Sequence, residues 1–126
     1  MLESKDKALG LAKIIDSKGA LNISVIYIGE LSSVADYIVL ASGASERQVR
    51  ATAEFVVDEY KKADIRPLGV EGIGTNRWVL VDYGDVVLHV FLEELRGYYD
   101  MDGLWADAKR IETNFGPPEK KEVEPT

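Results

Sequence analysis

The stretch WVLVDYGDVVLHVF, residues 78–91, decides the fold because apolar residues alternate on both sides of a turn that contains glycine. A two-residue loop at Tyr83–Gly84 or Gly84–Asp85 closes it into a β-hairpin, since glycine tolerates the positive φ that such loops need. Side chains along a strand point alternately to opposite faces, so either loop sorts the residues into the same two sets. One set is entirely aliphatic and is predicted to pack on helices: Val79, Val81, Val86, Leu88 and Val90.

The second face of this hairpin mixes aromatic, apolar and polar side chains: Trp78, Leu80, Asp82, Val87, His89 and Phe91. His89 is the only histidine in the chain, and either loop makes it a cross-strand or diagonal neighbour of Trp78. Two interpretations stay open. Another helix covers the face and His89 is a core residue held by a hydrogen bond, or the face is an exposed docking platform, because tryptophan is enriched among interface hot spots.

Helix and strand signals alternate in the first third of the chain. Apolar spacing predicts a helix over residues 2–18, and alternation predicts a strand over residues 21–28. The continuous apolar run YIVLA, residues 37–41, predicts a central strand that is buried on both faces.

A second helix is signalled by Ser45, which is a good N-cap and is followed three residues later by Gln48, as in a capping box. This helix is predicted to run to about Lys62, and a short edge strand is expected around Leu68–Val70. After the hairpin the chain is helical in pieces. Asp102 is the expected N-cap of a last short helix that carries Leu104, Trp105, Ala108 and Ile111.

This order of elements predicts an α/β fold with a mixed sheet of about five strands, packed by helices on one side. Residues 1–115 are expected to form a single domain. Residues 116–126, GPPEKKEVEPT, are rich in proline and charge and are expected to be a disordered tail.

Composition excludes several classes of function. The net charge of −7 disfavours binding to nucleic acid through phosphates and favours a basic protein partner. No apolar run is long enough for a membrane helix, and no secretory signal is recognisable, so a cytoplasmic protein is expected. With no cysteine and one histidine, neither a metal site nor a cofactor is predicted.

One rival interpretation is a small nucleotidyltransferase-like enzyme that binds a nucleotide. The segment GASER, residues 43–47, is a turn that leads into a helix, where backbone N–H groups can hold a phosphate. It lacks the pattern of a P-loop, and a plain helix cap at Ser45 explains it as well.

Several motifs together resemble the ribosomal silencing factor family, also called the Iojap family. They are ADYIVLASGASERQVRA (35–51), EG (71–72), the hairpin sequence of residues 78–91, RGYY (96–99) and LWADA (104–108). The resemblance covers residues 1–113. It implies a domain like a minimal nucleotidyltransferase that lacks the catalytic carboxylates and is not an enzyme. It also implies binding to ribosomal protein fourteen of the large ribosomal subunit, which blocks joining of the small subunit and represses translation when nutrients are limiting.

The candidate partner-binding residues follow from the hairpin and from the motifs. Trp78 and Leu80 are expected to supply an apolar anchor. His89 and Asp82 are expected to make polar contacts that fix the position of the partner, with Asp82 facing a basic side chain. Self-association of this face into a homodimer is a further alternative. The full candidate set adds Val87 on the same face and the motif positions Glu71, Arg96 and Tyr99, for which capping or bracing of the hairpin is an equal alternative.

Overall fold

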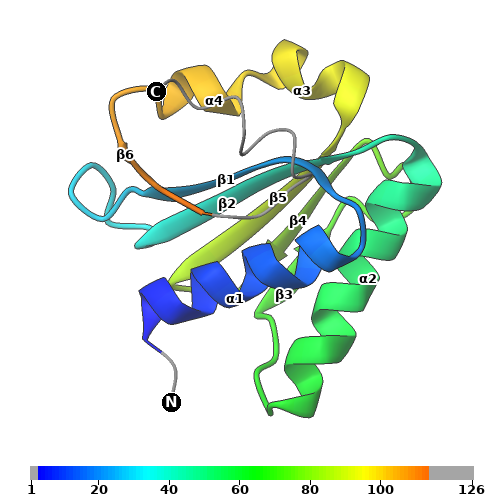
Figure 1. Cartoon of the computed structure of the whole chain (residues 1–126), viewed down its shortest axis with the longest axis horizontal. Helices are drawn as coiled ribbons and strands as arrows, with labels where there is room; N and C mark the ends of the chain where they lie inside the picture. Colours follow the sequence, from blue (N-terminus) through cyan, green and yellow to red (C-terminus); the bar gives the residue numbers. More distant parts are fainter. Residues whose placement is uncertain (1–2, 114–126) are drawn as a thin grey trace, which may run out of the picture.

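A six-stranded mixed sheet forms the centre of the structure, a computed structural model in which residues 3–113 are described. The strand order is β3-β4-β5-β2-β1-β6, and β2 and β5 run parallel while the other neighbours run antiparallel (Figure 1). The predicted α/β fold with a mixed sheet is confirmed, with one strand more than expected. The strands are β1 (Leu21–Tyr27), β2 (Tyr37–Gly43), β3 (Gly69–Glu71), β4 (Trp78–Asp82), β5 (Val86–Leu92) and β6 (Lys109–Ile111).

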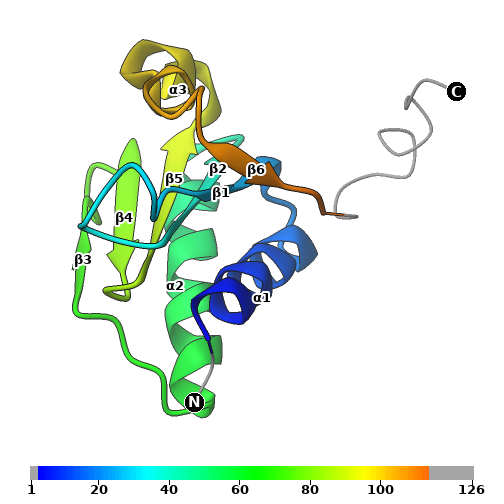
Figure 2. The same cartoon turned by 90° about the vertical axis from the view of Figure 1, so that its left-hand side faces the viewer.

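Helices cover both faces of this sheet, but unequally. The long helices α1 (Ser4–Ser17) and α2 (Glu46–Lys62) lie on one face, and the short helices α3 (Glu93–Tyr99) and α4 (Met101–Leu104) lie on the other (Figures 1 and 2). The expectation of helices on one side is therefore wrong for the segment after β5. Because α3 and α4 are short, they cover only part of the second face.

The face under α1 and α2 holds the main core. All five aliphatic residues that the hairpin was predicted to bury are completely inaccessible to solvent there, and they pack with Leu11, Ile15 and Val56 of the two helices. Full burial of one such side chain contributes about 1.5–3 kcal/mol. This confirmed prediction explains why the hairpin belongs to the centre of the sheet.

The start of α2 follows the predicted cap. The Ser45 hydroxyl accepts a hydrogen bond from the Gln48 N–H at 3.1 Å, and the helix ends at Lys62. The side chain therefore satisfies one of the N–H groups that a helix start leaves without a partner.

The segment after α3 differs from its prediction. Asp100, not Asp102, caps α4 by accepting a hydrogen bond from the Gly103 N–H at 3.1 Å, and α4 ends at Leu104. Residues 109–111 form β6 against the outer edge of β1 instead of continuing the helix. The strand places Ile111 opposite Val25, where it packs on the main core, so burial and edge pairing outweigh the local helix signal.

The predicted disordered tail, residues 116–126, lies outside the described residues. Within residues 3–113, no helix is long and apolar enough to cross a membrane.

Candidate docking face on the sheet

The β4–β5 hairpin closes with the two-residue loop Gly84–Asp85, one of the two predicted loops. The Tyr83 N–H donates to the Val86 carbonyl at 2.9 Å on either side of that loop. This register puts Leu80 directly opposite His89 and makes Trp78 the diagonal neighbour of His89, as the alternation predicts.

A hydrogen bond joins the side chains of Trp78 and His89. The Trp78 Nε1–H donates to Nδ1 of His89 at 2.9 Å, and the two ring centroids are 5.8 Å apart. Because Nδ1 accepts this bond, the neutral imidazole carries its proton on Nε2. Among residues 3–113, Nε2 has no hydrogen-bond partner.

Burial keeps this imidazole neutral. His89 is 6% exposed, and its removal from water lowers its pKa from 6.5 to about 4. The ring is therefore uncharged at neutral pH and offers one hydrogen-bond donor. In the described part of the chain, no three His, Cys, Asp or Glu side chains converge as a metal site would require.

Aromatic side chains fill the part of the second face next to α3. The Tyr99 ring lies 4.7 Å from the Trp78 ring and is tilted by 46°, and the Phe91 ring lies 5.2 Å from Trp78 and 5.9 Å from Tyr99, so the three rings contact one another. We call Trp78, His89, Phe91 and Tyr99 the aromatic cluster. Phe91 is fully buried, whereas Trp78 and Tyr99 are half-buried. The first interpretation, core under another helix, is correct for this end of the face.

The rest of the face is more open, and we call Glu71, Leu80, Asp82 and Val87 the open strip. Glu71 is exposed, and the other three are half-buried. Glu71 lies opposite Leu80, so these two side chains continue the row that ends at His89. Within residues 3–113, Leu80 packs into neither of the two buried apolar clusters. A half-buried leucine outside both clusters is available to a partner.

Asp82 serves the hairpin itself with one of its oxygens. Its Oδ1 accepts a hydrogen bond from the Gly84 N–H at 2.7 Å, which holds the turn. Its Oδ2 has no hydrogen-bond or ion-pair partner among residues 3–113. One carboxylate oxygen is therefore free to meet a basic group.

Arg96 has an internal role that matches bracing, one of the two roles expected for it. Its guanidinium donates to both oxygens of Asp102 at 2.9 and 3.0 Å and lowers the pKa of that carboxyl group. It also donates to the Asn22 carbonyl at 2.6 Å and to the Ser42 hydroxyl at 3.1 Å. Arg96 therefore ties α3 to β1 and β2 and holds the helix that carries Tyr99.

The partners of Arg96 were not found from the sequence. Asp102 was interpreted as a helix cap, and nothing in the spacing of Asn22 and Ser42 indicates contact with α3. Ser42 is fully buried in a run that reads as apolar, and a buried hydroxyl requires a hydrogen-bond partner. That requirement is the one signal in the sequence that pointed to such a network.

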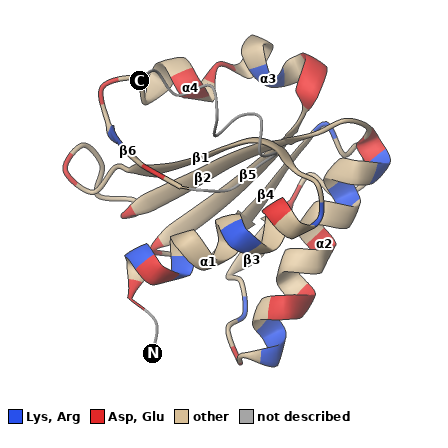
Figure 3. Ribbon diagram, viewed as in Figure 1, with Lys and Arg blue, Asp and Glu red and all other residues tan. Residues whose placement is uncertain are grey.

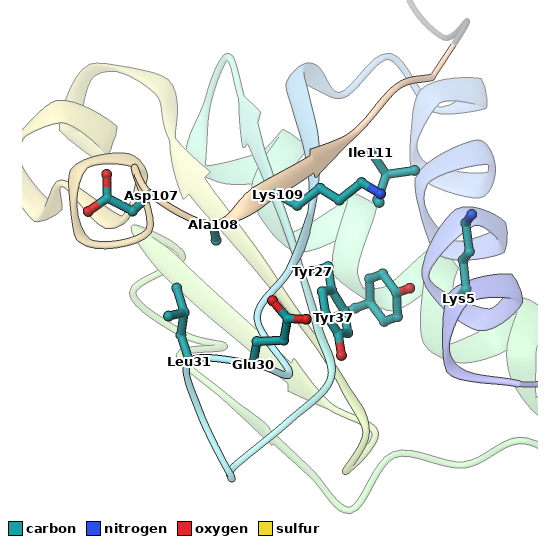
Figure 4. A pocket seen from close by; sticks show the side chains of 9 residues that line it. All are labelled: Lys5, Tyr27, Glu30, Leu31, Tyr37, Asp107, Ala108, Lys109 and Ile111. Carbon is teal, nitrogen blue, oxygen red and sulfur yellow. The ribbon is translucent and has the colours of Figure 1, made fainter.

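A hollow of about 420 Å³ lies at the end of the sheet near β6 and is a second place to consider for binding (Figure 4). Its lining carries two lysines, two acidic residues and the ring pair Tyr27 and Tyr37, whose centroids are 5.2 Å apart. The opposite charges balance, so this hollow has no clear preference for an anion or a cation. It is lined by Lys5, Tyr27, Glu30, Leu31, Tyr37, Asp107, Ala108, Lys109 and Ile111.

The turn that a nucleotide-binding enzyme would use is occupied by the helix cap. A hollow of about 540 Å³ beside Ser45 is also lined by Glu46, Arg77 and Glu94. Arg77 lies 3.7 Å from Glu46, so the cation nearest the turn already faces a carboxylate. A phosphate entering here would meet two acidic side chains, which disfavours the rival interpretation.

Comparisons with known proteins agree with the motifs. A family model described as "Ribosomal silencing factor during starvation" matches residues 1–126. The Ribosomal silencing factor RsfS of Bacillus subtilis is 40% identical over 105 residues, which are 83% of this chain and 89% of that protein. The mouse protein "Mitochondrial assembly of ribosomal large subunit protein 1" is 32% identical over 98 residues, which are 75% of this chain and 43% of that protein.

Solved structures share the fold. A crystal structure of a Chromobacterium violaceum protein is similar with a TM-score of 0.81 and 31% identity, covering 94% of this chain and 98% of that one. A Bacillus halodurans crystal structure gives a TM-score of 0.75 and 33% identity, covering 86% and 99% of the two chains.

Proposed function

The chain belongs to the ribosomal silencing factor family, and from this premise we propose that it binds ribosomal protein fourteen on the large ribosomal subunit. Bound there, it leaves no room for the small subunit and represses translation when nutrients are limiting. The action is steric and needs no catalysis. A relative that is named for assembly of the ribosomal large subunit supports the choice of subunit.

The open strip next to the aromatic cluster is the observation that carries this proposal. It combines an unpacked apolar side chain, Leu80, with the carboxylates of Glu71 and Asp82, and it borders the neutral ring of His89 in the aromatic cluster. Interface cores use apolar anchors surrounded by a small number of oriented polar groups. The strip has this composition.

Charge favours a basic protein surface as the partner. The whole chain has a net charge of −7, and the central strands β1, β2 and β5 carry no charged side chain (Figure 3). The charged side chains therefore lie outside these three strands, where acidic residues outnumber basic ones by 22 to 15. Complementary charge raises the rate of encounter and sets orientation, while the apolar centre supplies most of the affinity.

Each candidate residue then has a distinct part. Leu80 and Val87 enter the apolar centre, and Asp82 Oδ2 and Glu71 meet basic side chains. Trp78 and Tyr99 contribute the part of their surface that stays exposed, while the hydrogen bond from Trp78 orients His89. Arg96 contributes indirectly, because it holds α3 in place.

Sedimentation of the purified protein with isolated large and small subunits tests the proposal. We expect the protein to sediment with large subunits alone and to reduce their joining with small subunits in a gradient. Leu80→Asp should weaken large-subunit binding by about thirtyfold, the change expected from loss of ~2 kcal/mol at an interface hot spot.

Ala51→Asp is the matched control, because Ala51 is an exposed apolar residue of α2, which lies on the opposite face of the sheet. It introduces the same charge away from the open strip and should bind like the parent. Thermal melts check that both variants are folded. Equal binding by Leu80→Asp and the parent would show that the open strip is not the docking surface.

A further inference from the structure

The β3 edge of the sheet carries unused backbone hydrogen-bonding groups. The Asp82 carbonyl accepts from the Leu68 N–H at 2.6 Å, so the backbone groups of Asp82 face β3. Backbone groups in an antiparallel pair alternate along each strand. Gly69 and Glu71 therefore bond to β4, while Val70 turns its N–H and C=O outward. Within residues 3–113, no strand pairs with this outer edge of β3.

An apolar groove lies beside this edge. Its volume is about 370 Å³, and Val70 and Ile73, each 39% exposed, form one wall against α2. Leu68, just before β3, is 78% exposed. Natural proteins usually protect an edge strand with charge, proline or a covering element, so an edge bordered by three exposed apolar side chains is a candidate for pairing.

The opposite edge of the sheet shows the protected alternative. The edge strand β6 carries Lys109 and Arg110. Arg110 bonds to the Ser24 hydroxyl at 2.8 Å and lies 3.7 Å from Asp102, so its charge sits over the edge. The two edges of one sheet are therefore built differently.

The charges beside the groove select its occupant. Glu54 and Asp58 line it from α2. Glu54 pairs with Arg50 at 3.0 Å, whereas Asp58 makes no ion pair within 4 Å among residues 3–113. Lys62, which interacts with Asp58 at longer range, pairs with Glu59. Lys61 follows Asp58 by one turn and is outside the lining. A second copy of this chain would bring the same carboxylates to the same place, and like charges oppose that pairing.

We propose that the β3 edge and the groove beside it dock an extended basic segment of a protein partner. The segment adds a strand to the sheet through the N–H and C=O of Val70, its apolar side chains enter the groove, and its cations face Asp58. This mode of recognition takes affinity from main-chain bonds and specificity from alternate side chains. It adds a contact that the proposed function does not require, although Glu71 connects the edge to the open strip.

A synthetic seven-residue peptide of alternating lysine and valine, with blocked ends, is the direct probe. In the NMR spectrum of the ¹⁵N-labelled protein, we expect saturable shifts of the Val70 and Ile73 amides. Asp58→Lys should weaken peptide binding about tenfold, and raised salt should weaken it further, because the contact is electrostatic. A peptide with glutamate in place of lysine is the control and should cause no shifts.

Val70→Pro tests the backbone contact in the folded protein. It removes the outward N–H and leaves the bonds to β4, a position where edge strands tolerate proline. We expect at least about tenfold weaker binding to the peptide, with most of the affinity regained in Val70→Thr, which restores the N–H. The same variants are also sedimented with large ribosomal subunits.

The outcomes separate this inference from the proposed function. Peptide shifts that Val70→Pro abolishes support the edge site whether or not the parent binds large subunits, and so does a Val70→Pro defect in subunit binding alone. If the peptide causes no shifts and Val70→Pro binds subunits like the parent, or if the glutamate peptide binds equally, the inference is wrong. A dimer in analytical ultracentrifugation that Val70→Pro dissociates would also overturn it, in favour of a second copy.

Discussion

The two faces of the β4–β5 hairpin are made of alternate residues of one short stretch, yet they meet different neighbours. One face is entirely aliphatic and lies under the long helices α1 and α2. The other is covered only at one end by α3 and α4, and it mixes rings, carboxylates and a histidine. Adjacent residues of one strand are therefore fully buried on one side, while Trp78, Leu80, Asp82 and Val87 stay partly exposed on the other.

Leucine truncation on each face gives the largest contrast. Leu88 is fully buried under the helices, so Leu88→Ala should lower the free energy of unfolding by about 2–5 kcal/mol. Leu80 is half-buried and outside both clusters, so Leu80→Ala should lower it by less than about 1 kcal/mol. Urea unfolding of both variants measures the difference.

Subunit sedimentation of the same pair sharpens this contrast. Leu88→Ala should bind large subunits in proportion to its folded fraction, and Leu80→Ala should lose affinity while folded. If Leu80→Ala proves as unstable as Leu88→Ala, the open strip is core and the comparison between the faces fails.

Substitution of two arginines tests whether the Arg96 network holds α3 on the second face of the sheet. Arg96 is buried and bonded to Asp102, Asn22 and Ser42, so Arg96→Ala should lower the free energy of unfolding by about 2 kcal/mol. The effect is below that of a fully buried pair because Asp102 remains partly exposed. Arg50→Ala removes an exposed pair with Glu54 and should change stability by less than about 0.5 kcal/mol. Equal effects would show that the Arg96 network does not anchor α3.

Acid should weaken the second face through His89. The pKa of His89 is about 4 in the folded protein, below its ordinary 6.5, so the unfolded chain binds more protons as the pH falls. The contribution of the neutral ring is therefore present above pH 6.5 and is lost progressively toward pH 4. Between pH 7 and pH 5, linkage predicts a loss of about 2 kcal/mol in the free energy of unfolding. Urea unfolding across this range measures it.

His89→Gln is the control for the acid effect, because glutamine does not titrate. Aspartate and glutamate side chains titrate mainly below about pH 5, so the chosen range isolates the imidazole. The stability of His89→Gln should change little between pH 7 and pH 5. If the free energy of unfolding of the parent also changes little between pH 7 and pH 5, water reaches the His89 ring and the aromatic cluster is open.

The sequence predicted the parts of this fold that depend on local alternation. The two faces of the hairpin, its two-residue loop, the Ser45 cap and the central strand β2 follow from the period of the apolar residues and from turn chemistry. These features need no information about distant segments.

The parts that failed depend on neighbours far away in the chain. Residues 109–111 become β6 because β1 offers a free edge, and Asp102 leaves its expected cap because Arg96 binds it. On the second face, the alternation placed the hairpin residues on the correct side of the sheet but could not say how far α3 extends over them. Trp78 was expected to be a free anchor, but its N–H donates to His89 and its ring packs against Tyr99.

The smallest predicted effect concerns the hydrogen bond from Trp78 to His89. It tests whether Trp78 orients the imidazole or only packs against it. Trp78→Phe keeps an aromatic ring next to Phe91 and Tyr99 and removes the donor to His89 together with a small part of the ring area. The lost bond should lower the free energy of unfolding by about 1 kcal/mol. With Nδ1 released, the hydrogen bond no longer fixes the imidazole proton on Nε2, and the form with the proton on Nδ1 becomes populated. NMR of the imidazole nitrogens should therefore show one tautomer in the parent and a mixture in Trp78→Phe. Affinity for large subunits should fall a few-fold more than stability explains. An unchanged tautomer would mean that Trp78 packs against His89 without orienting it.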